Sequence, residues 1–148
     1  MTFPKAALCG ALIATFAAAA APARAEFSYL SPAQTKARQC QDTRNAGSWA
    51  ESLPICLSAA ALFKRLGDDE KRNPWYSYEV QGEMLEAAAV DYAGLGRHRE
   101  SLDTAIDAHR LLLYVYKTYA MDDDDRTDIA AVTTRLARLE VQERQALR

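Results

Sequence analysis

Apolar residues recur at three- and four-residue steps along most of the chain, and no stretch alternates apolar and polar residues as a half-buried strand does. The few Gly and Pro residues fall between these periodic stretches. The pattern therefore predicts an all-α chain of five helices. We expect them at about residues 32–46, 49–66, 74–95 and 99–120, with the last running from about 126 to near the C-terminus.

Local signals set the expected helix ends, and the spacing of apolar residues sets the expected buried faces. Ser31-Pro32 and Asn73-Pro74 combine an N-cap residue with proline at the first helical position. Gly67 is expected to end the second helix as a C′ glycine. The expected buried positions are Ala33, Ala37, Cys40 and Thr43; Leu53, Cys56, Leu57, Ala60 and Phe63; Tyr78, Gln81, Leu85, Ala88, Tyr92 and Leu95; Leu102, Ala105, Ile106, His109, Leu112, Leu113 and Tyr116; and Ile129, Val132, Leu136 and Leu139.

The first 25 residues have the layout of a secretory signal peptide. Lys5 is followed by an uncharged, Ala-rich run and then by the small-x-small site Ala23-Arg24-Ala25. An uncleaved membrane anchor is the alternative, although the run is short and only weakly hydrophobic. Cleavage after Ala25 leaves 148 − 25 = 123 residues, so we expect one domain at 26–148. An Ala-rich leader is typical of bacteria, which indicates the periplasm.

Composition and charge exclude several classes of protein. The chain is 49% hydrophobic with a formal net charge of −2, the profile of an ordinary globular domain. Removing Lys5 and Arg24 with the leader leaves 18 − 2 = 16 basic and 20 acidic residues, a net charge of −4. No basic block stands out, so we expect no nucleic-acid partner.

Cys40 and Cys56 are the two cysteines that remain after cleavage. An even count in an oxidising compartment favours a disulfide, which would close a 15-residue loop and contribute about 3 kcal/mol. Two buried free thiols are the alternative. No His or further Cys lies nearby at the spacing of a metal site.

A short internal repeat relates two parts of the chain. Gly47, Ser52 and Leu53 match Gly96, Ser101 and Leu102 at an offset of 49 residues. Cys56, Leu57 and Ala59 then match Ala105, Ile106 and Ala108 as small, aliphatic and small residues. Two helical hairpins of one design are the natural interpretation.

On these residues the chain resembles the tetratricopeptide repeat (TPR) family over about residues 33–120. The second hairpin carries the family pattern as Tyr92, Gly96, Ser101, Leu102, Ala105 and Ala108, and the first as Gly47, Ser52, Leu53, Cys56 and Ala59. Thr43 replaces the expected aromatic residue, the usual Pro after the second helix is missing, and the offset exceeds the family's repeat length of about 34 residues. A generic helical bundle with similar turns is the alternative.

The resemblance implies a right-handed α-solenoid of two TPR-like hairpins, closed by a C-terminal capping helix. It also implies that Cys40 and Cys56 face each other across the first hairpin. In the family, the first helix of each hairpin lines a concave groove. The candidate binding residues in that groove are therefore Gln34, Gln41, Arg44 and Asn45 in the first hairpin and Glu83, Glu86 and Val90 in the second.

Searches for catalytic or metal-binding patterns identify no strong candidate, and we expect no catalytic residue, metal or cofactor. His98 and His109 lie about 16 Å apart along one helix, too far to share a metal ion. We expect His98 to be solvated and His109 to belong to the core. The four acids Asp122 to Asp125 lack the Gly and Glu of a calcium loop, so we expect them to favour the N-terminus of the last helix. Met84 and His109 as axial haem ligands are a further alternative.

These observations favour a non-enzymatic, exported scaffold that binds a protein or peptide through its groove. Two hairpins make a short groove, which self-association would extend. A small helical bundle that binds a cofactor or small ligand is the alternative function. An enzyme of an unfamiliar kind is a third, for which the sequence identifies no nucleophile or base.

Overall fold

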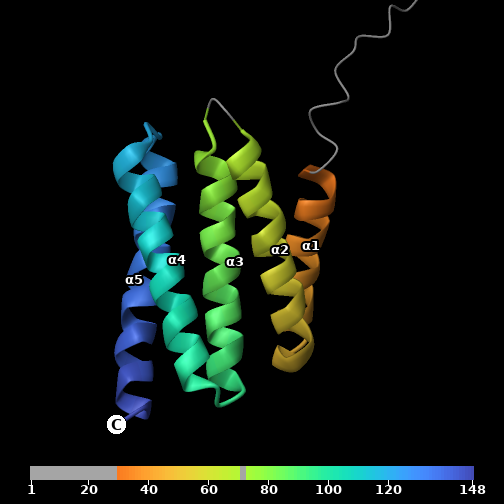
Figure 1. The fold of residues 1–148 in the computed structure, drawn as a ribbon, viewed down its shortest axis with the longest axis vertical. Helices are drawn as coiled ribbons and strands as arrows, with labels where there is room; N and C mark the ends of the chain where they lie inside the picture. The colour runs from red at the N-terminus through yellow and green to blue at the C-terminus, as the bar shows by residue number, and fades with distance from the viewer. Residues whose placement is uncertain (1–29, 71–72) are drawn as a thin grey trace, which may run out of the picture.

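The computed structural model describes residues 30–70 and 73–148, and all regular secondary structure in these residues is helical. The five helices are α1 (Leu30–Asn45), α2 (Trp49–Asp69), α3 (Trp75–Gly94), α4 (His98–Thr118) and α5 (Asp123–Ala146). Figure 1 shows them side by side, from α1 at one edge to α4 and α5 at the other. The expectation of an all-α chain is confirmed. The predicted signal peptide, residues 1–25, lies outside the described residues.

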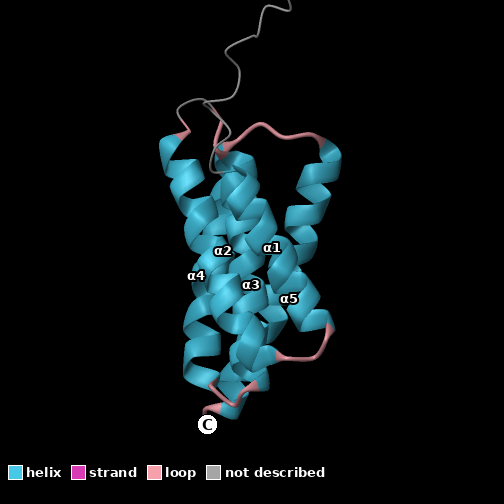
Figure 2. Ribbon diagram, turned by 90° about the vertical axis from the view of Figure 1, so that its right-hand side faces the viewer, coloured by secondary structure: helices cyan, strands magenta, loops and turns pink. Residues whose placement is uncertain are grey.

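The five helices form two layers. Helices that follow one another in sequence pack closely, and α3 also contacts α1 and α5. Figure 2 shows α2 and α4 toward one side of the molecule and α1, α3 and α5 toward the other. As a result, α3 is the central helix, and α1 and α5 flank it within its own layer.

The two hairpin turns have the same backbone structure. Gly47 and Gly96 adopt positive φ angles of 81° and 72°, which L side chains rarely adopt. Each glycine N–H donates to the carbonyl three residues earlier, and the next N–H donates to the carbonyl five residues before it. This is the Schellman pattern of a helix end. The predicted repeat therefore describes two turns of equal geometry, and α2 and α4 begin 98 − 49 = 49 residues apart.

Burial after the two turns follows the same repeat. Ser52 and Ser101 are both fully buried, and Leu53 and Leu102 are both 6% exposed. The small residues that follow, Cys56 with Ala105 and Ala59 with Ala108, are all fully buried. The matched residues thus occupy equivalent places in the packing of α2 and α4.

The core consists of two clusters that meet at α3. One joins α1, α2 and α3 through Cys40, Leu53, Cys56, Ala59, Ala60, Met84, Ala87 and Ala88. The other joins α3, α4 and α5 through Ala89, Ala105, Ala108, Leu112, Val115, Ile129, Val132 and Leu136. Small residues dominate the first cluster, so each of its side chains buries little apolar area.

The buried face predicted for α3 is only partly correct. Leu85 and Tyr92 are half-buried and pack against the core, whereas Leu95 lies beyond the helix and is 39% exposed. The buried positions include the polar residues Ser77, Glu79 and Asp91. A helix packed by neighbours on several sides has no single apolar stripe, so its periodicity misidentifies the face.

Gly67 does not end α2. The helix continues to Asp69, and Gly67 is buried within it against the ring of Tyr78 on α3. A Cβ at position 67 would lie 2.5 Å from Cε1 of that ring. The glycine therefore permits close packing of α2 on α3 rather than terminating a helix. Three predicted starts are also displaced. The helix α1 already includes Ser31, Pro74 is the N-cap residue of α3, and α5 begins at Asp123 rather than at about residue 126.

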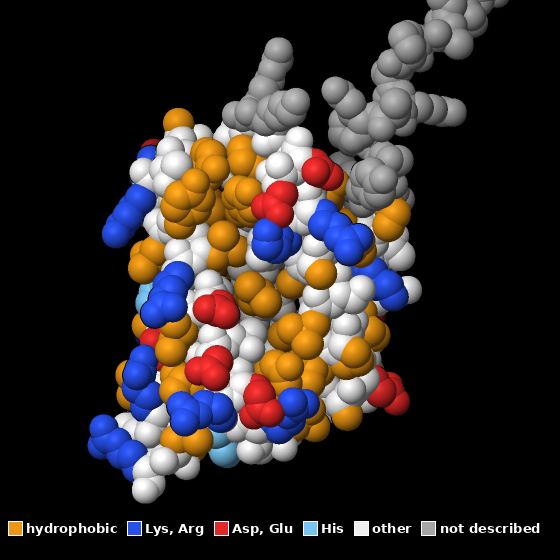
Figure 3. All heavy atoms as spheres, in the orientation of Figure 1, with side chains coloured by type: hydrophobic (Ala, Val, Ile, Leu, Met, Phe, Trp, Pro, Cys, Tyr) orange, Lys and Arg blue, Asp and Glu red, His pale blue; other side chains and the backbone are white. Residues whose placement is uncertain are grey.

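On α4, Leu113 and Tyr116 were expected in the core but are 38% and 37% exposed. The remaining expected apolar positions of α4 are buried or half-buried. Figure 3 shows the face of the molecule over α2 and α4, where hydrophobic and charged side chains are interspersed and Lys and Arg line the edge over α4 and α5. Among the described residues, no helix is long and apolar enough to cross a membrane.

Candidate functional site

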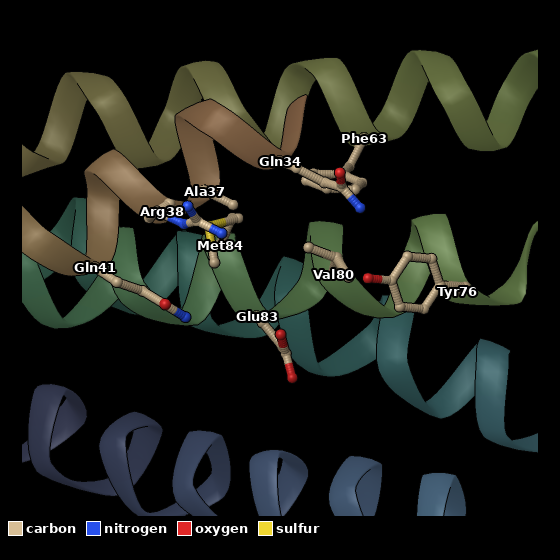
Figure 4. A pocket seen from close by; sticks show the side chains of 9 residues that line it. All are labelled: Gln34, Ala37, Arg38, Gln41, Phe63, Tyr76, Val80, Glu83 and Met84. Carbon is tan, nitrogen blue, oxygen red and sulfur yellow. The ribbon is translucent and has the colours of Figure 1, made fainter. Parts of the chain in front are cut away.

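An open hollow of about 240 Å³ lies between α1 and α3, with α5 opposite (Figure 4). Pockets for drug-sized ligands usually measure about 300–1,000 Å³, so this one suits single side chains better than a cofactor. Its lining residues are Gln34, Ala37, Arg38 and Gln41 of α1, Phe63 of α2, and Tyr76, Val80, Glu83 and Met84 of α3. We call this hollow, together with Glu79, Glu86 and Val90 of α3 and Asp125, Asp128 and Arg135 of α5, the α1/α3/α5 face.

Three of the predicted groove residues, Gln34, Gln41 and Glu83, line the hollow. Val90 is half-buried further along α3, and Asn45 is exposed at the end of α1. The remaining two, Arg44 and Glu86, are each held in an ion pair with another helix. The structure therefore brings part of the predicted set together at one hollow.

Glu79 is a buried carboxyl group on the α5 side of this face. It is 8% exposed, and none of the ion pairs among the described residues involves it. Burial, followed by the negative charges of Glu83, Asp125 and Asp128, raises the pKa of Glu79 to about 7. Its charged form is thus poorly stabilised by the protein itself.

Glu83 lies one helical turn further along α3, and Figure 4 shows its side chain extending toward α5. Burial and the nearby carboxylate of Glu86 raise the pKa of Glu83, and Arg135 opposes that rise. Glu83 also takes part in none of the ion pairs found in the described part of the chain. It is therefore a carboxylate that lines the hollow without an ion pair among the described residues.

Glu86 and Arg135 join α3 to α5. Arg135 donates from Nε to Oε1 of Glu86 at 2.6 Å and from its terminal nitrogen to Oε2 at 2.9 Å. This two-pronged geometry matches the guanidinium fork to the carboxylate. The charge of Glu86 is thus satisfied within the protein, which makes it a structural link as well as a predicted groove residue.

Asp91 is a fully buried carboxylate that connects three helices. Arg44 of α1 donates from Nε to its Oδ1 at 2.9 Å, and Ser52 of α2 donates from Oγ to its Oδ2. Sequence reasoning missed this network, because Arg44 and Asp91 are 47 residues apart and no local pattern relates them. Arg44 therefore has a structural role that the groove prediction did not include.

The sulfur atoms of Cys40 and Cys56 lie at disulfide-bonding distance, 2.03 Å. The expected pairing across α1 and α2 is thus confirmed, and both residues are fully buried. Sγ of Cys56 also lies 3.7 Å from Oδ2 of Asp91. Because α1 forms one wall of the hollow, the disulfide and the Asp91 network together hold that wall in place.

Both histidines pair with glutamates of α5. Nδ1 of His98 lies 2.8 Å from Oε2 of Glu143, and Nδ1 of His109 lies 2.7 Å from Oε1 of Glu140. His98 was expected to be solvated, and its side chain is 39% exposed, although its partner Glu143 is buried. His109 was expected in the core and is only half-buried. The two pairs fasten α4 to α5.

The acidic turn and the Met84 and His109 pair are the two places where the sequence left a metal alternative open. Within residues 30–70 and 73–148, no three His, Cys, Asp or Glu residues are grouped so as to hold a metal ion. Asp122 is the N-cap of α5, and its side chain accepts a hydrogen bond from the backbone N–H of Asp125 at 2.9 Å. The acidic turn thus serves the helix N-terminus, as expected. Met84 lines the hollow by α1, whereas His109 lines a second hollow between α4 and α5.

Comparison with known proteins yields no relative. No protein-family model, curated protein or solved structure matches the chain.

Proposed function

We propose that the protein is a non-enzymatic, exported scaffold that binds a protein or peptide partner on its α1/α3/α5 face. In this proposal the two hairpins form the start of a TPR-like right-handed solenoid, and α5 closes it. The equal turns at Gly47 and Gly96 and the matched burial after them support a repeated hairpin. The single observation that carries the proposal is the open hollow lined by Gln34, Gln41 and Glu83.

The chemistry of the hollow favours a polypeptide over a small ligand. Side-chain amides both donate and accept hydrogen bonds, as peptide groups do. Tyr76 is 46% exposed at the rim, where aromatic residues are common in protein interfaces. A bundle that binds a cofactor or small molecule remains the weaker alternative, because the hollow is smaller than ordinary ligand pockets.

The proposed location is the bacterial periplasm, reached through a signal peptide that is cleaved after Ala25. A disulfide-bonded pair is typical of oxidising compartments, and Cys40 and Cys56 form such a pair. N-terminal sequencing of the protein released by osmotic shock tests this proposal. A mature chain that begins at Glu26 supports export, whereas a protein retained in the cytoplasm with its first 25 residues contradicts it.

Site-specific photo-cross-linking in intact cells tests the binding surface. A photoreactive amino acid replaces Gln41 or Glu83 in the full chain, and matched variants carry it at Asp103 or Asp107. Both control positions are exposed on α4, in the other layer of helices. We expect both groove variants to yield an adduct with the same partner.

The controls decide between specific binding and chance contact. An adduct formed from Gln41 and Glu83, but not from Asp103 and Asp107, supports the proposed surface. Equal yields from all four positions, or no adduct from the two groove positions, would overturn it. The same gels show whether the adduct is a dimer of this chain, which would assign the face to self-association instead.

A further inference from the structure

The side of the α1/α3/α5 face between α3 and α5 carries more negative charge than its own side chains neutralise. Five carboxylates meet there, from Glu79, Glu83 and Glu86 on α3 and from Asp125 and Asp128 on α5. Arg135 acts on Glu83, but Glu86 already holds it in two hydrogen bonds. A partner that brings positive charge to this side would therefore gain electrostatic energy.

Glu79 adds a carboxyl group for which the described part of the protein supplies no donor. It is 8% exposed beside Glu83, and no hydrogen bond among the described residues involves its carboxyl group, whose oxygens are not fully buried. An incoming ammonium or guanidinium group would supply the missing donors.

On the α1 wall of the hollow, two amide side chains are spaced like groups of an extended peptide. Gln34 and Gln41 are seven residues apart on α1 and line the same hollow, so they are offset by about 10.5 Å along the helix. Three residues of an extended peptide span about the same distance. Two amides at this spacing match the backbone N–H and C=O groups of an extended peptide. A free polyamine has no such backbone groups.

The two charged side chains of the hollow, Arg38 and Glu83, lie on opposite sides of it (Figure 4). Arg38 lies on the α1 wall beside Met84, while Glu83 extends away from it toward α5 (Figure 4). The apolar side chains of Val80 and Met84 also line the hollow and can pack against an aliphatic stem. A cationic side chain would thus meet carboxylates only on the α5 side.

We propose that the α1/α3/α5 face binds an extended peptide segment and selects it by a Lys or Arg side chain placed beside Glu83. The amides of Gln34 and Gln41 bind the backbone of that segment, and Val80 and Met84 contact the stem of the cationic side chain. This inference rests on the proposed function, since it names the partner of the same surface.

Selection from a phage-displayed library of random 12-residue peptides tests the inference on the exported, purified protein. We expect the enriched sequences to share a Lys or Arg at a fixed position. Fluorescence anisotropy with one labelled, enriched peptide then gives its affinity for each variant. Glu83→Gln should weaken binding at least about tenfold, equivalent to 1.4 kcal/mol.

Asp107→Asn is the matched control, because it removes one exposed carboxylate from the other layer with a similarly small change in volume. It should leave the affinity unchanged. Far-UV circular dichroism (CD) checks that both variants are folded. Equal weakening by both variants, or no weakening by Glu83→Gln, would overturn the inference.

The failure of this inference is distinguishable from failure of the proposed function. Enriched peptides that lack Lys and Arg but compete with the partner found by cross-linking at Gln41 would refute cation selection and leave the binding surface intact. Cation selection would also be refuted by a second pair of results: spermine displaces an enriched peptide, and the Lys→Ala form of that peptide still binds. Absence of any enriched peptide, together with absence of adducts at Gln41 and Glu83, would overturn both proposals.

Discussion

Removing Arg44 should destabilise the protein far more than removing an ordinary surface cation. Its partner Asp91 is fully buried, whereas the side chain of Arg44 is 29% exposed. Truncating Arg44 therefore leaves a carboxylate in the core with Ser52 as its remaining strong donor. Breaking a buried pair in this way costs about 3–5 kcal/mol. Because Arg44 is partly solvated, we expect a value near the lower end, about 3 kcal/mol.

Urea and thermal unfolding, followed by far-UV CD, measure this cost. For a domain of this size, about 3 kcal/mol corresponds to a fall of roughly 10–15 °C in Tm. Lys64→Ala is the control, because Lys64 and Asp68 form an exposed pair within α2. Exposed pairs contribute about 0–1 kcal/mol. A loss for Arg44→Ala below about 1 kcal/mol, no larger than that for Lys64→Ala, would refute the reasoning.

A double-mutant cycle isolates the interaction itself. Asp91→Asn removes the buried charge while keeping the size of the side chain. In that background, Arg44→Ala should cost about 1 kcal/mol or less, since no buried charge is left unpaired. If Arg44→Ala costs the same in both backgrounds, its effect comes from lost packing of its aliphatic stem.

Three further predictions concern other parts of the fold. The pKa of Glu79 is about 7 in the native state and has its ordinary value of 4.5 in the unfolded state. Between these pH values the native state therefore binds more protons than the unfolded state. The free energy of unfolding should fall as the pH rises from 4.5 to about 7. Glu79→Gln should remove up to about 3 kcal/mol of this fall, measured by urea unfolding at pH 5 and pH 8; an unchanged pH profile would contradict the burial argument. Replacing Cys40 and Cys56 together by Ala should cost about 3 kcal/mol, and the reducing agent that destabilises the wild type should then have no effect on the variant. Gly82→Ala should destabilise by about 1–3 kcal/mol, because its Cβ would lie 2.6 Å from Cγ of buried Leu112; a higher Tm would show that helix propensity outweighs this clash.

Local signals made most of the fold predictable. The positive φ angles of Gly47 and Gly96 and the cap at Asp122 depend on residues close in sequence, so helix number and turn positions follow from the chain alone. Gly67 shows where this reasoning fails. Its local signal resembles a helix end, but its role depends on Tyr78 of another helix.

The candidate site was predictable only in part, for a related reason. A family resemblance selected Gln34, Gln41 and Glu83, and all three line the hollow. The burial of Glu79 and the pairing of Arg44 with Asp91 arise from packing between helices, which no periodicity records. Polar residues on a helix packed on several sides look like surface positions in the sequence.

Nuclear magnetic resonance mapping of the bound partner tests the central claim most directly. The ¹⁵N-labelled protein is titrated with the peptide segment that cross-links to Gln41, and backbone shifts are followed residue by residue. The account predicts that the largest changes cluster on α1 and α3 around Gln34, Gln41, Val80 and Glu83. Changes centred instead on the exposed side of α4, around Asp103 and Asp107, would contradict it.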